Sequence, residues 1–280
     1  MQFGDYRVEI VPDTEFRLDG GAMFGVVPRN LWSRVAPPDD QNRIRMNMNC
    51  LFIEAGSERI LIETGIGEKW SSKHAALYGI TRKRSLADSL RAITGYGPEA
   101  ITIVINTHLH FDHAGGNTML NDSGEAIPAF SNARYYLSQD EYEHAEQPSE
   151  RDRASYLPEN WQPAYNNGQV ELKPADYEVV PGLRMETHPG HNRSMQCWRL
   201  QQQGQTLFGF ADLVPMRAHV QLPWIMGYDL FPVETLASKK RLLPQAAREG
   251  WGCLFYHEPD AAFYRVVEDD GKLRTAEFEM

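Results

Sequence analysis

Four side chains of the types that bind metal ions lie close together near the middle of the chain. They stand in the segment His108-Leu109-His110-Phe111-Asp112-His113. Alternate side chains of an extended segment point to the same side, so His108 and His110 face one way, while Asp112 and His113 follow where the chain turns. A single ion does not need so many ligands. The spacing predicts two adjacent ion positions, the arrangement used by metal-dependent hydrolases.

Three further candidate ligands follow strand-like runs in the second half of the chain, and they are His191, Asp212 and His257. Strand ends at one edge of a sheet converge in space. The tight turn before His191 aims this ring at the metals, and His188 is expected to face elsewhere because the turn can hardly present both. Asp212 is the natural bridge, since one carboxylate can donate an oxygen to each ion. His257 is the weakest of the three from spacing alone.

The elements that position these side chains alternate along the chain. Short apolar runs predict strands at residues 51–55, 59–63, 101–105, 177–180, 183–187, 196–200, 206–210 and 253–256. A helix is expected to begin after the N-cap Ser85, and a second helix is expected over residues 233–248. This pattern predicts an α/β fold with two packed sheets and helices outside, in one domain over residues 1–280. A polar stretch at about 138–167 is interpreted as a helical insertion.

Charge and cysteine usage limit the partners and the compartment. The formal net charge is −10, and no basic run is present that would follow a nucleic-acid backbone or an anionic membrane. The three cysteines, Cys50, Cys197 and Cys253, are widely spaced and form no CxxC pair. No apolar run reaches the length of a membrane span. We therefore expect a cytoplasmic protein that acts on a small molecule, without nucleic acid or membrane as a partner.

Three segments carry a resemblance to a known family, and they are Leu18–Pro28, Thr107–Ala114 and Phe255–His257. Together with the candidate ligands in their order along the chain, they resemble the metallo-β-lactamase-fold hydrolases, and within these the quorum-quenching N-acyl-homoserine lactonases, particularly their putative-lactonase subgroup. The resemblance implies an αββα four-layer sandwich. It also implies a hydrolase that opens a lactone ring by attack of a metal-bridging hydroxide.

The resemblance assigns the ligands to two ions. One ion would be held by His108, His110 and His191, the other by Asp112, His113 and His257, with Asp212 as the bridge. The ions are implied to be zinc, although the same ligand types suit Fe²⁺, Mn²⁺ or Co²⁺. Asp112 is further expected to pass a proton to the departing alkoxide.

Two positions depart from the family pattern. Pro215 stands three residues after Asp212, where many such lactonases have a tyrosine that hydrogen-bonds the substrate carbonyl. We take His219 and Tyr228 as candidates for that catalytic role, and the alternative for both is an ordinary loop residue or one that supports a ligand. Glu63 stands where the family usually has Asp, and we expect it to lie behind the metal ligands.

Substrate and assembly stay open at this point. Gly21–Gly25 with Leu31-Trp32 would line an acyl-chain pocket, or would pack onto the core or a second subunit, so a homodimer is one of the alternatives. The same metal site would also suit another ester, a thioester, a lactam or an organophosphate. A redox enzyme and a non-catalytic binding module are the alternatives from other classes.

Overall fold

A computed structural model describes residues 1–278 and divides them into two compact units. Unit 1 consists of Met1–Thr14 with Met48–Tyr177, and unit 2 consists of Glu15–Asn47 with the chain from Glu178 onward. Each unit is thus built from two separate stretches of sequence. A single domain over residues 1–280 stays a prediction.

Unit 1 is organised around a seven-stranded sheet with the order β1-β2-β5-β6-β7-β10-β11. Its strands are β1 (Gln2–Phe3), β2 (Tyr6–Pro12), β5 (Asn49–Ala55), β6 (Glu58–Ile62), β7 (Ile103–Ile105), β10 (Arg134–Ser138) and β11 (Val170–Lys173). The strands from β6 to β11 are parallel, and those from β1 to β6 are antiparallel. The side chains of β7 are buried throughout, as expected for a parallel strand covered on both faces.

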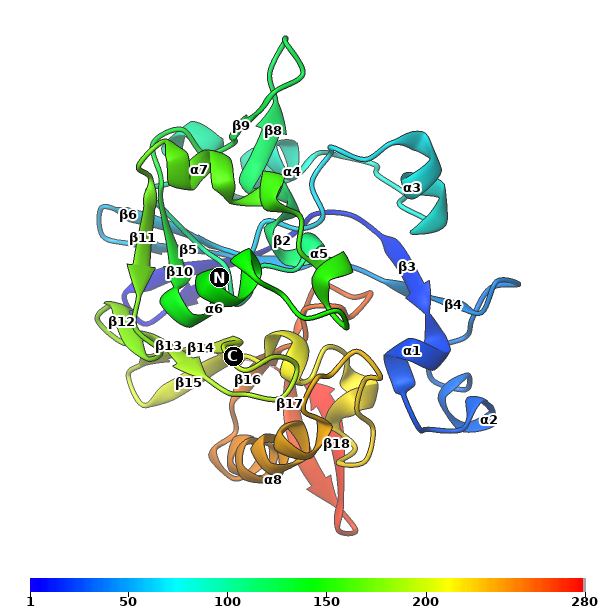
Figure 1. Cartoon of the computed structure of the whole chain (residues 1–280). Coiled ribbons are helices and arrows are strands. Elements are labelled where there is room, and N and C mark those ends of the chain that lie inside the picture. Colours follow the sequence, from blue (N-terminus) through cyan, green and yellow to red (C-terminus); the bar gives the residue numbers. More distant parts are fainter. Residues whose placement is uncertain (279–280) are drawn as a thin grey trace. The chain divides into compact units, whose positions relative to one another are not determined.

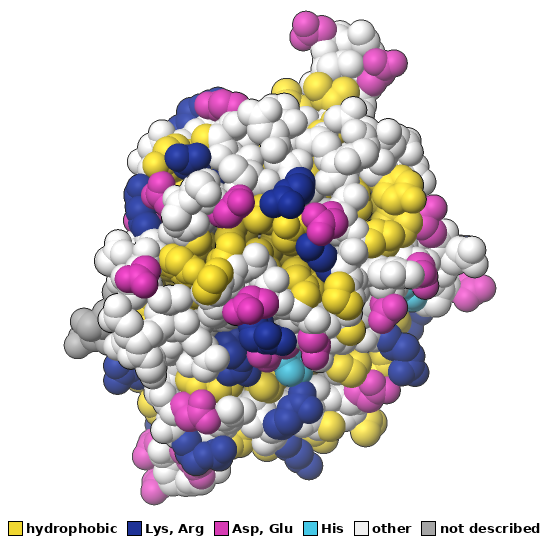
Figure 2. All heavy atoms as spheres, turned by 90° about the vertical axis from the view of Figure 1, so that its left-hand side faces the viewer, with side chains coloured by type: hydrophobic (Ala, Val, Ile, Leu, Met, Phe, Trp, Pro, Cys, Tyr) yellow, Lys and Arg dark blue, Asp and Glu magenta, His cyan; other side chains and the backbone are white. Residues whose placement is uncertain are grey.

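Short helices and one hairpin complete unit 1 (Figure 1). They are α3 (Ser72–Leu77), α4 (Leu86–Thr94), α5 (Phe111–Ala114), α6 (Gln139–Glu146), α7 (Gln162–Asn166), and the paired strands β8 (Thr118–Leu120) and β9 (Ala126–Pro128). Helix α4 begins as predicted, because the Ser85 hydroxyl accepts a hydrogen bond from the Asp88 N–H at 3.0 Å. Acidic side chains gather at the tip of the β8–β9 hairpin at the top of Figure 2.

Unit 2 is organised around a second seven-stranded sheet with the order β12-β13-β14-β15-β16-β17-β18. Its strands are β12 (Tyr177–Val180), β13 (Leu183–Thr187), β14 (Gln196–Gln202), β15 (Gln205–Gly209), β16 (Gly252–Leu254), β17 (Phe263–Asp269) and β18 (Lys272–Glu277). Helix α8 (Pro232–Glu249) packs against β17. It starts with proline at its first position and ends at Gly250 in the left-handed conformation, which are favourable residues at those positions.

The first stretch of unit 2 forms a two-stranded sheet and two short helices. These are β3 (Phe16–Asp19), β4 (Arg43–Met46), α1 (Gly20–Phe24) and α2 (Arg29–Trp32). Met23, Phe24 and Trp32 are buried there. Of the two alternatives for this segment, these three side chains therefore follow the one in which it packs into a core. They are not available as the walls of an acyl-chain pocket.

The expected mixed α/β fold with two large sheets is confirmed. Each predicted strand has a counterpart within a few residues, and the second predicted helix is α8. Other strands were not predicted from the sequence, among them the β17–β18 hairpin and the pair β3–β4. Charged residues interrupt the apolar pattern in all four of these strands, which weakens the periodic signal on which strand prediction depends.

A close backbone contact in unit 1 holds the metal-binding motif against the loop after β6. Gly67 has a φ of +67°, and a Cβ atom at this residue would overlap the carbonyl of Gly115, two residues after His113. Gly65 and Ala114 form an isolated parallel bridge in the same region. Only glycine at position 67 satisfies both the backbone conformation and the space.

We predict that Gly67→Ala destabilises the protein more than Gly56→Ala. Both residues have positive φ, but a Cβ at Gly56 meets no atom within 4 Å. The control should lose about 1–2 kcal/mol from the left-handed conformation alone, and Gly67→Ala should lose about 1–3 kcal/mol more from the overlap. Urea unfolding of the metal-free proteins measures the difference, and equal losses would contradict the proposed contact.

Candidate metal centre

The motif lies directly after β7, where the chain leaves the sheet of unit 1. His108, His110, Asp112 and His113 are all buried, and His110 precedes the first residue of α5. The ring centroids of His108 and His113 are 4.0 Å apart, and those of His108 and His110 are 4.5 Å apart. The short helix therefore gathers the three histidines into one cluster, as the spacing predicts.

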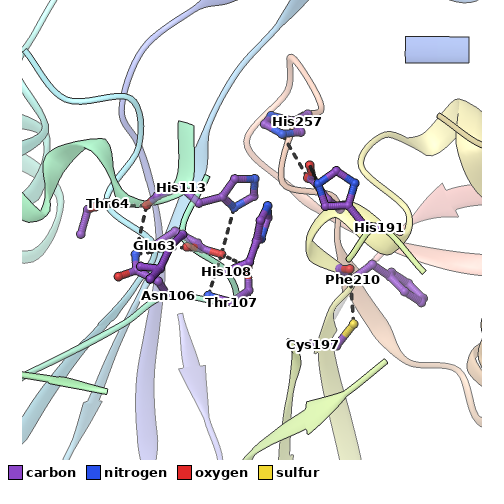
Figure 3. A network of polar contacts seen from close by, with 12 residues as sticks. Glu63, Thr64, Asn106, Thr107, His108, His113, His191, Cys197, Phe210 and His257 are labelled. Carbon is purple, nitrogen blue, oxygen red and sulfur yellow. Dashed lines mark hydrogen bonds and ion pairs between the residues drawn. The ribbon is translucent and has the colours of Figure 1, made fainter. Parts of the chain in front are cut away.

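Glu63 fixes the ring of His113 from behind. Its Oε1 lies 3.1 Å from His113 Nδ1 and also accepts the hydroxyl hydrogen bond of Thr107 (Figure 3). A carboxylate partner at Nδ1 leaves Nε2 of the ring to face a metal. His108 is held in a similar way, because its Nδ1 lies 3.1 Å from the Thr107 hydroxyl. The expectation that Glu63 lies behind a ligand agrees with this geometry.

Unit 2 brings together the three remaining candidate ligands. One carboxylate oxygen of Asp212 lies 3.5 Å from His191 Nε2, and its other oxygen lies 3.1 Å from His257 Nε2. The rings of His191 and His257 lie beside each other in Figure 3. Each oxygen of Asp212 thus lies beside one imidazole nitrogen, and a carboxylate can offer one oxygen to each of two ions.

The outer nitrogens of these two rings are also bonded. His191 Nδ1 lies 3.1 Å from Asp229 Oδ1, and the Thr235 hydroxyl donates to Asp229 Oδ2 at 2.6 Å. His257 Nδ1 lies 3.1 Å from the Asn47 carbonyl oxygen, which can only accept, so this nitrogen carries the proton. Sequence reasoning missed Asp229, because it lies 38 residues from His191 and no spacing rule connects the two.

His188 belongs to a different group of contacts. Its Nε2 lies 3.4 Å from a carboxylate oxygen of Glu186, and its Nδ1 lies 2.8 Å from the Arg241 guanidinium. Both ring nitrogens are engaged by side chains outside the ligand set. The structure therefore explains why His191, and not His188, is the candidate ligand of this turn.

The two candidates for the missing tyrosine lie in different environments. His219 is buried on the 3₁₀ helix η6 (Arg217–Val220), and its Nε2 lies 2.9 Å from the Met23 carbonyl oxygen. Tyr228 lies in a turn and is 39 % exposed. Pro215 supplies its carbonyl to the backbone N–H of His257 at 2.9 Å, so this residue supports the turn that carries a candidate ligand.

Strained backbone occurs beside the ligands in both units. Glu63 has a φ of +68°, and Ala211, the residue before Asp212, has a φ of +46°. Residues other than glycine rarely adopt this left-handed region, and such strain concentrates at functional sites. The strained backbone at Glu63 orients the carboxylate that supports His113. The strained backbone at Ala211 orients the next residue, the candidate ligand Asp212.

The donor set fits divalent transition metals. Unit 1 gathers the rings of His108, His110 and His113 into one cluster, and unit 2 adds two imidazoles around a carboxylate. Imidazole nitrogen and carboxylate oxygen are ligands that Zn²⁺, Fe²⁺, Mn²⁺ and Co²⁺ all accept. Metal use is therefore supported, while the choice among these ions is left to experiment.

We predict that the charges behind the rings raise metal affinity. Glu63→Gln and Asp229→Asn should each weaken metal binding about 10–100-fold, because the neutral amides polarise and orient His113 and His191 less well. Competition with a chromophoric chelator measures the affinity. Glu186→Gln is the matched control, since Glu186 contacts Arg199 and His188 instead of a candidate ligand. An unchanged affinity in both site variants would contradict these roles.

Known proteins share both the sequence pattern and the fold. The N-acyl homoserine lactonase of Bacillus cereus is 33 % identical over 55 % of this chain and 58 % of its own length, so the match spans less than two thirds of that relative. The N-acyl homoserine lactonase of Bacillus thuringiensis is 29 % identical over 75 % of this chain and 80 % of its own length.

Solved structures extend the likeness to the whole chain. A probable metal-dependent hydrolase from Staphylococcus aureus superposes with a TM-score of 0.89 at 29 % identity, covering 100 % of both chains. The dizinc quorum-quenching lactonase AidC superposes with a TM-score of 0.80 at 17 % identity, covering 100 % of this chain and 97 % of its own, which shows the shared fold. The sequence pattern of the metallo-beta-lactamase superfamily matches residues 44–250. With more than half of its length matched, this chain belongs to the metallo-beta-lactamase superfamily.

Proposed function

We propose that the protein is a metal-dependent hydrolase that opens the lactone ring of N-acyl-homoserine lactones. The observation that carries this proposal is the Asp212 carboxylate held between two histidines whose outer nitrogens are fixed. The substrate class follows from the relatives in Bacillus, which are named N-acyl homoserine lactonases. Hydrolysis of another ester, a thioester, a lactam or an organophosphate is the alternative at the same site.

We propose that the seven candidate ligands act together on two divalent ions, most simply Zn²⁺. His108, His110 and His191 would hold one ion, Asp112, His113 and His257 the other, and Asp212 would bridge them. Such a pair of cations supplies an activated water and a polarised ester carbonyl near neutral pH.

Within this assignment the side chains have separate tasks. Asp212 lies between the Nε2 atoms of His191 and His257, with one beside each oxygen, and would offer an oxygen to each ion. Asp112 is buried and stands between Phe111 and His113 in the short helix α5. Its carboxylate would take the proton that the attacking water loses and pass it to the departing ring oxygen.

An aromatic cavity in unit 1 begins at the motif itself. It has a volume of about 290 Å³, and its walls include Trp70, Tyr78, Phe111 and Leu157. Phe111 stands between two candidate ligands, and its ring centroid lies 5.5 Å from that of Trp70 and 5.1 Å from that of Tyr78. Lys69, His74 and Glu159 also line the cavity, and its aromatic side is the part that suits an aliphatic chain. We propose this cavity, in place of the buried segment around Phe24, as the acyl-chain site.

The cysteines, the helices and the surface charge bear on the compartment and on the class of partner. Cys50, Cys197 and Cys253 are buried free thiols, which agrees with the proposed reducing cytoplasm. In the described part of the chain, no helix combines the length and the apolar character needed to cross a membrane. On the face shown in Figure 2, basic and acidic side chains are interspersed, which suits a small-molecule substrate better than a polyanion.

We predict that Asp212→Ala abolishes lactone hydrolysis, because the variant loses the proposed bridge. Metal-quantified protein should be assayed with acyl-homoserine lactone, β-lactam, phosphotriester and thioester substrates. Asp260→Ala, which removes an exposed carboxylate of the same unit, should retain wild-type activity. Absence of lactone turnover with turnover of another substrate would overturn the substrate assignment. Absence of all turnover and of bound metal would favour a non-catalytic binding module.

We predict that Trp70→Ala reduces the preference for long acyl chains. The rise in kcat/KM from butanoyl to decanoyl lactones should shrink about tenfold, because buried CH₂ groups contribute about 0.8 kcal/mol each and the variant loses one wall. Tyr165→Ala removes an exposed aromatic side chain of unit 1 that stacks on Tyr142, and should leave the profile unchanged. An unaltered chain-length profile in Trp70→Ala would place the acyl chain elsewhere.

A further inference from the structure

His219 is a buried ring that is held rigidly without belonging to the candidate ligands. It is 1 % exposed and stacks on Phe24 with ring centroids 4.7 Å apart and planes 8° apart. Phe24 in turn stacks on Trp32 at 5.3 Å and 7°. Because the three rings are nearly parallel, rotation of the imidazole is blocked and each of its nitrogens has a fixed direction.

The contact with Met23 decides which nitrogen of His219 carries the proton. The Met23 carbonyl oxygen, 2.9 Å from Nε2, can only accept, so Nε2 is the donor. Burial lowers the pKa of His219 to about 3, against smaller effects of the Met23 bond and of Asp212 that raise it. The ring is therefore neutral near pH 7, and Nδ1 carries a lone pair and no proton.

Nδ1 is buried and has no hydrogen-bond partner among residues 1–278. A buried acceptor that stays unsatisfied costs stability, so a donor is expected at this atom when the site is filled. Arg217, two residues before His219, donates its backbone N–H to Glu258, the residue after His257, so η6 lies beside the turn that carries a candidate ligand.

The backbone around His219 is tied to the turn that carries His257. The Arg217 N–H donates to Glu258 at 2.8 Å, and its guanidinium contacts the other oxygen of the same carboxylate at 3.0 Å. After η6, the ammonium group of Lys239 donates to the carbonyl oxygens of Gln221 and Trp224 at 2.8 and 2.7 Å. These contacts keep His219 at a constant position relative to a candidate ligand.

We propose that Nδ1 of His219 accepts a hydrogen bond from the amide N–H of the substrate and selects N-acyl-amido lactones over lactones without this group. The inference rests on the proposed function. The amide N–H is the one conventional donor common to these substrates, because the ring oxygen and both carbonyl groups only accept. In this role His219 accepts a hydrogen bond from the substrate amide instead of donating one to a carbonyl, because neutral His219 has no proton on Nδ1.

The test compares two substrates on the same protein sample. N-hexanoyl-homoserine lactone is compared with its analogue in which the amide N–H is replaced by CH₂, and kcat/KM is measured for ring opening. Wild type should prefer the amide by about tenfold or more, since a site built to bond a donor rejects the analogue that lacks it. The ratio of the two substrates is independent of the fraction of protein that is folded.

Two variants separate the two ring nitrogens. His219→Gln can keep a donor to Met23 but loses the acceptor at Nδ1, so the substrate ratio should fall to about one. His219→Asn places an amide oxygen near the position of Nδ1, so part of the preference should survive. Thermal unfolding and metal content of both variants are measured beside the kinetics.

The outcomes distinguish this inference from the proposed function. A wild-type protein that opens both lactones at equal rates, or a His219→Gln variant that keeps the wild-type ratio, would overturn the role of His219 alone. If His219→Gln loses kcat/KM equally on both substrates, the donor to Nδ1 is a water molecule and not the substrate amide, which also overturns the role. A fully metallated wild type that opens neither lactone would overturn the proposed function together with this inference.

Discussion

The orientation of the histidine rings is the constraint on which the candidate site depends. An imidazole presents one nitrogen to a metal reliably only when its other nitrogen is held. A carboxylate holds the outer nitrogen of His113 and of His191, and a backbone carbonyl holds that of His257. These acceptors come from segments remote in sequence, so the packing of strands and turns within each unit sets the direction in which every ring points.

This arrangement is costly for the protein without its metals. Glu63, Asp212 and Asp229 are buried carboxylates, and burial of negative charge is unfavourable unless cations or hydrogen bonds compensate. The positive φ values of Glu63 and Ala211 add backbone strain. Bound cations would offset the charge, which couples metal binding to the stability of the fold. The close contact between Gly67 and Gly115 holds the motif in place in the protein without metal.

The sequence predicts the parts of the site that depend on local spacing. The cluster from His108 to His113 follows from a strand that ends in a turn, and the end of β15 at Gly209 places Asp212 directly after the sheet. Asp229 was not predictable, because its contact with His191 depends on the turn before α8 packing back on the loop after β13. The tautomer of His219 was hidden for the same reason, since it depends on a carbonyl 196 residues away.

The central proposal is that the ligands of the His108–His113 motif and those of the second half of the chain hold one pair of ions together. A crystal structure of the Zn²⁺-loaded protein, with anomalous diffraction recorded at the zinc edge, tests it directly. The account predicts two anomalous peaks about 3.5–4 Å apart, with Asp212 contacting both. A single peak, or two peaks bound separately by the motif and by the second-half histidines with no shared carboxylate, would contradict it.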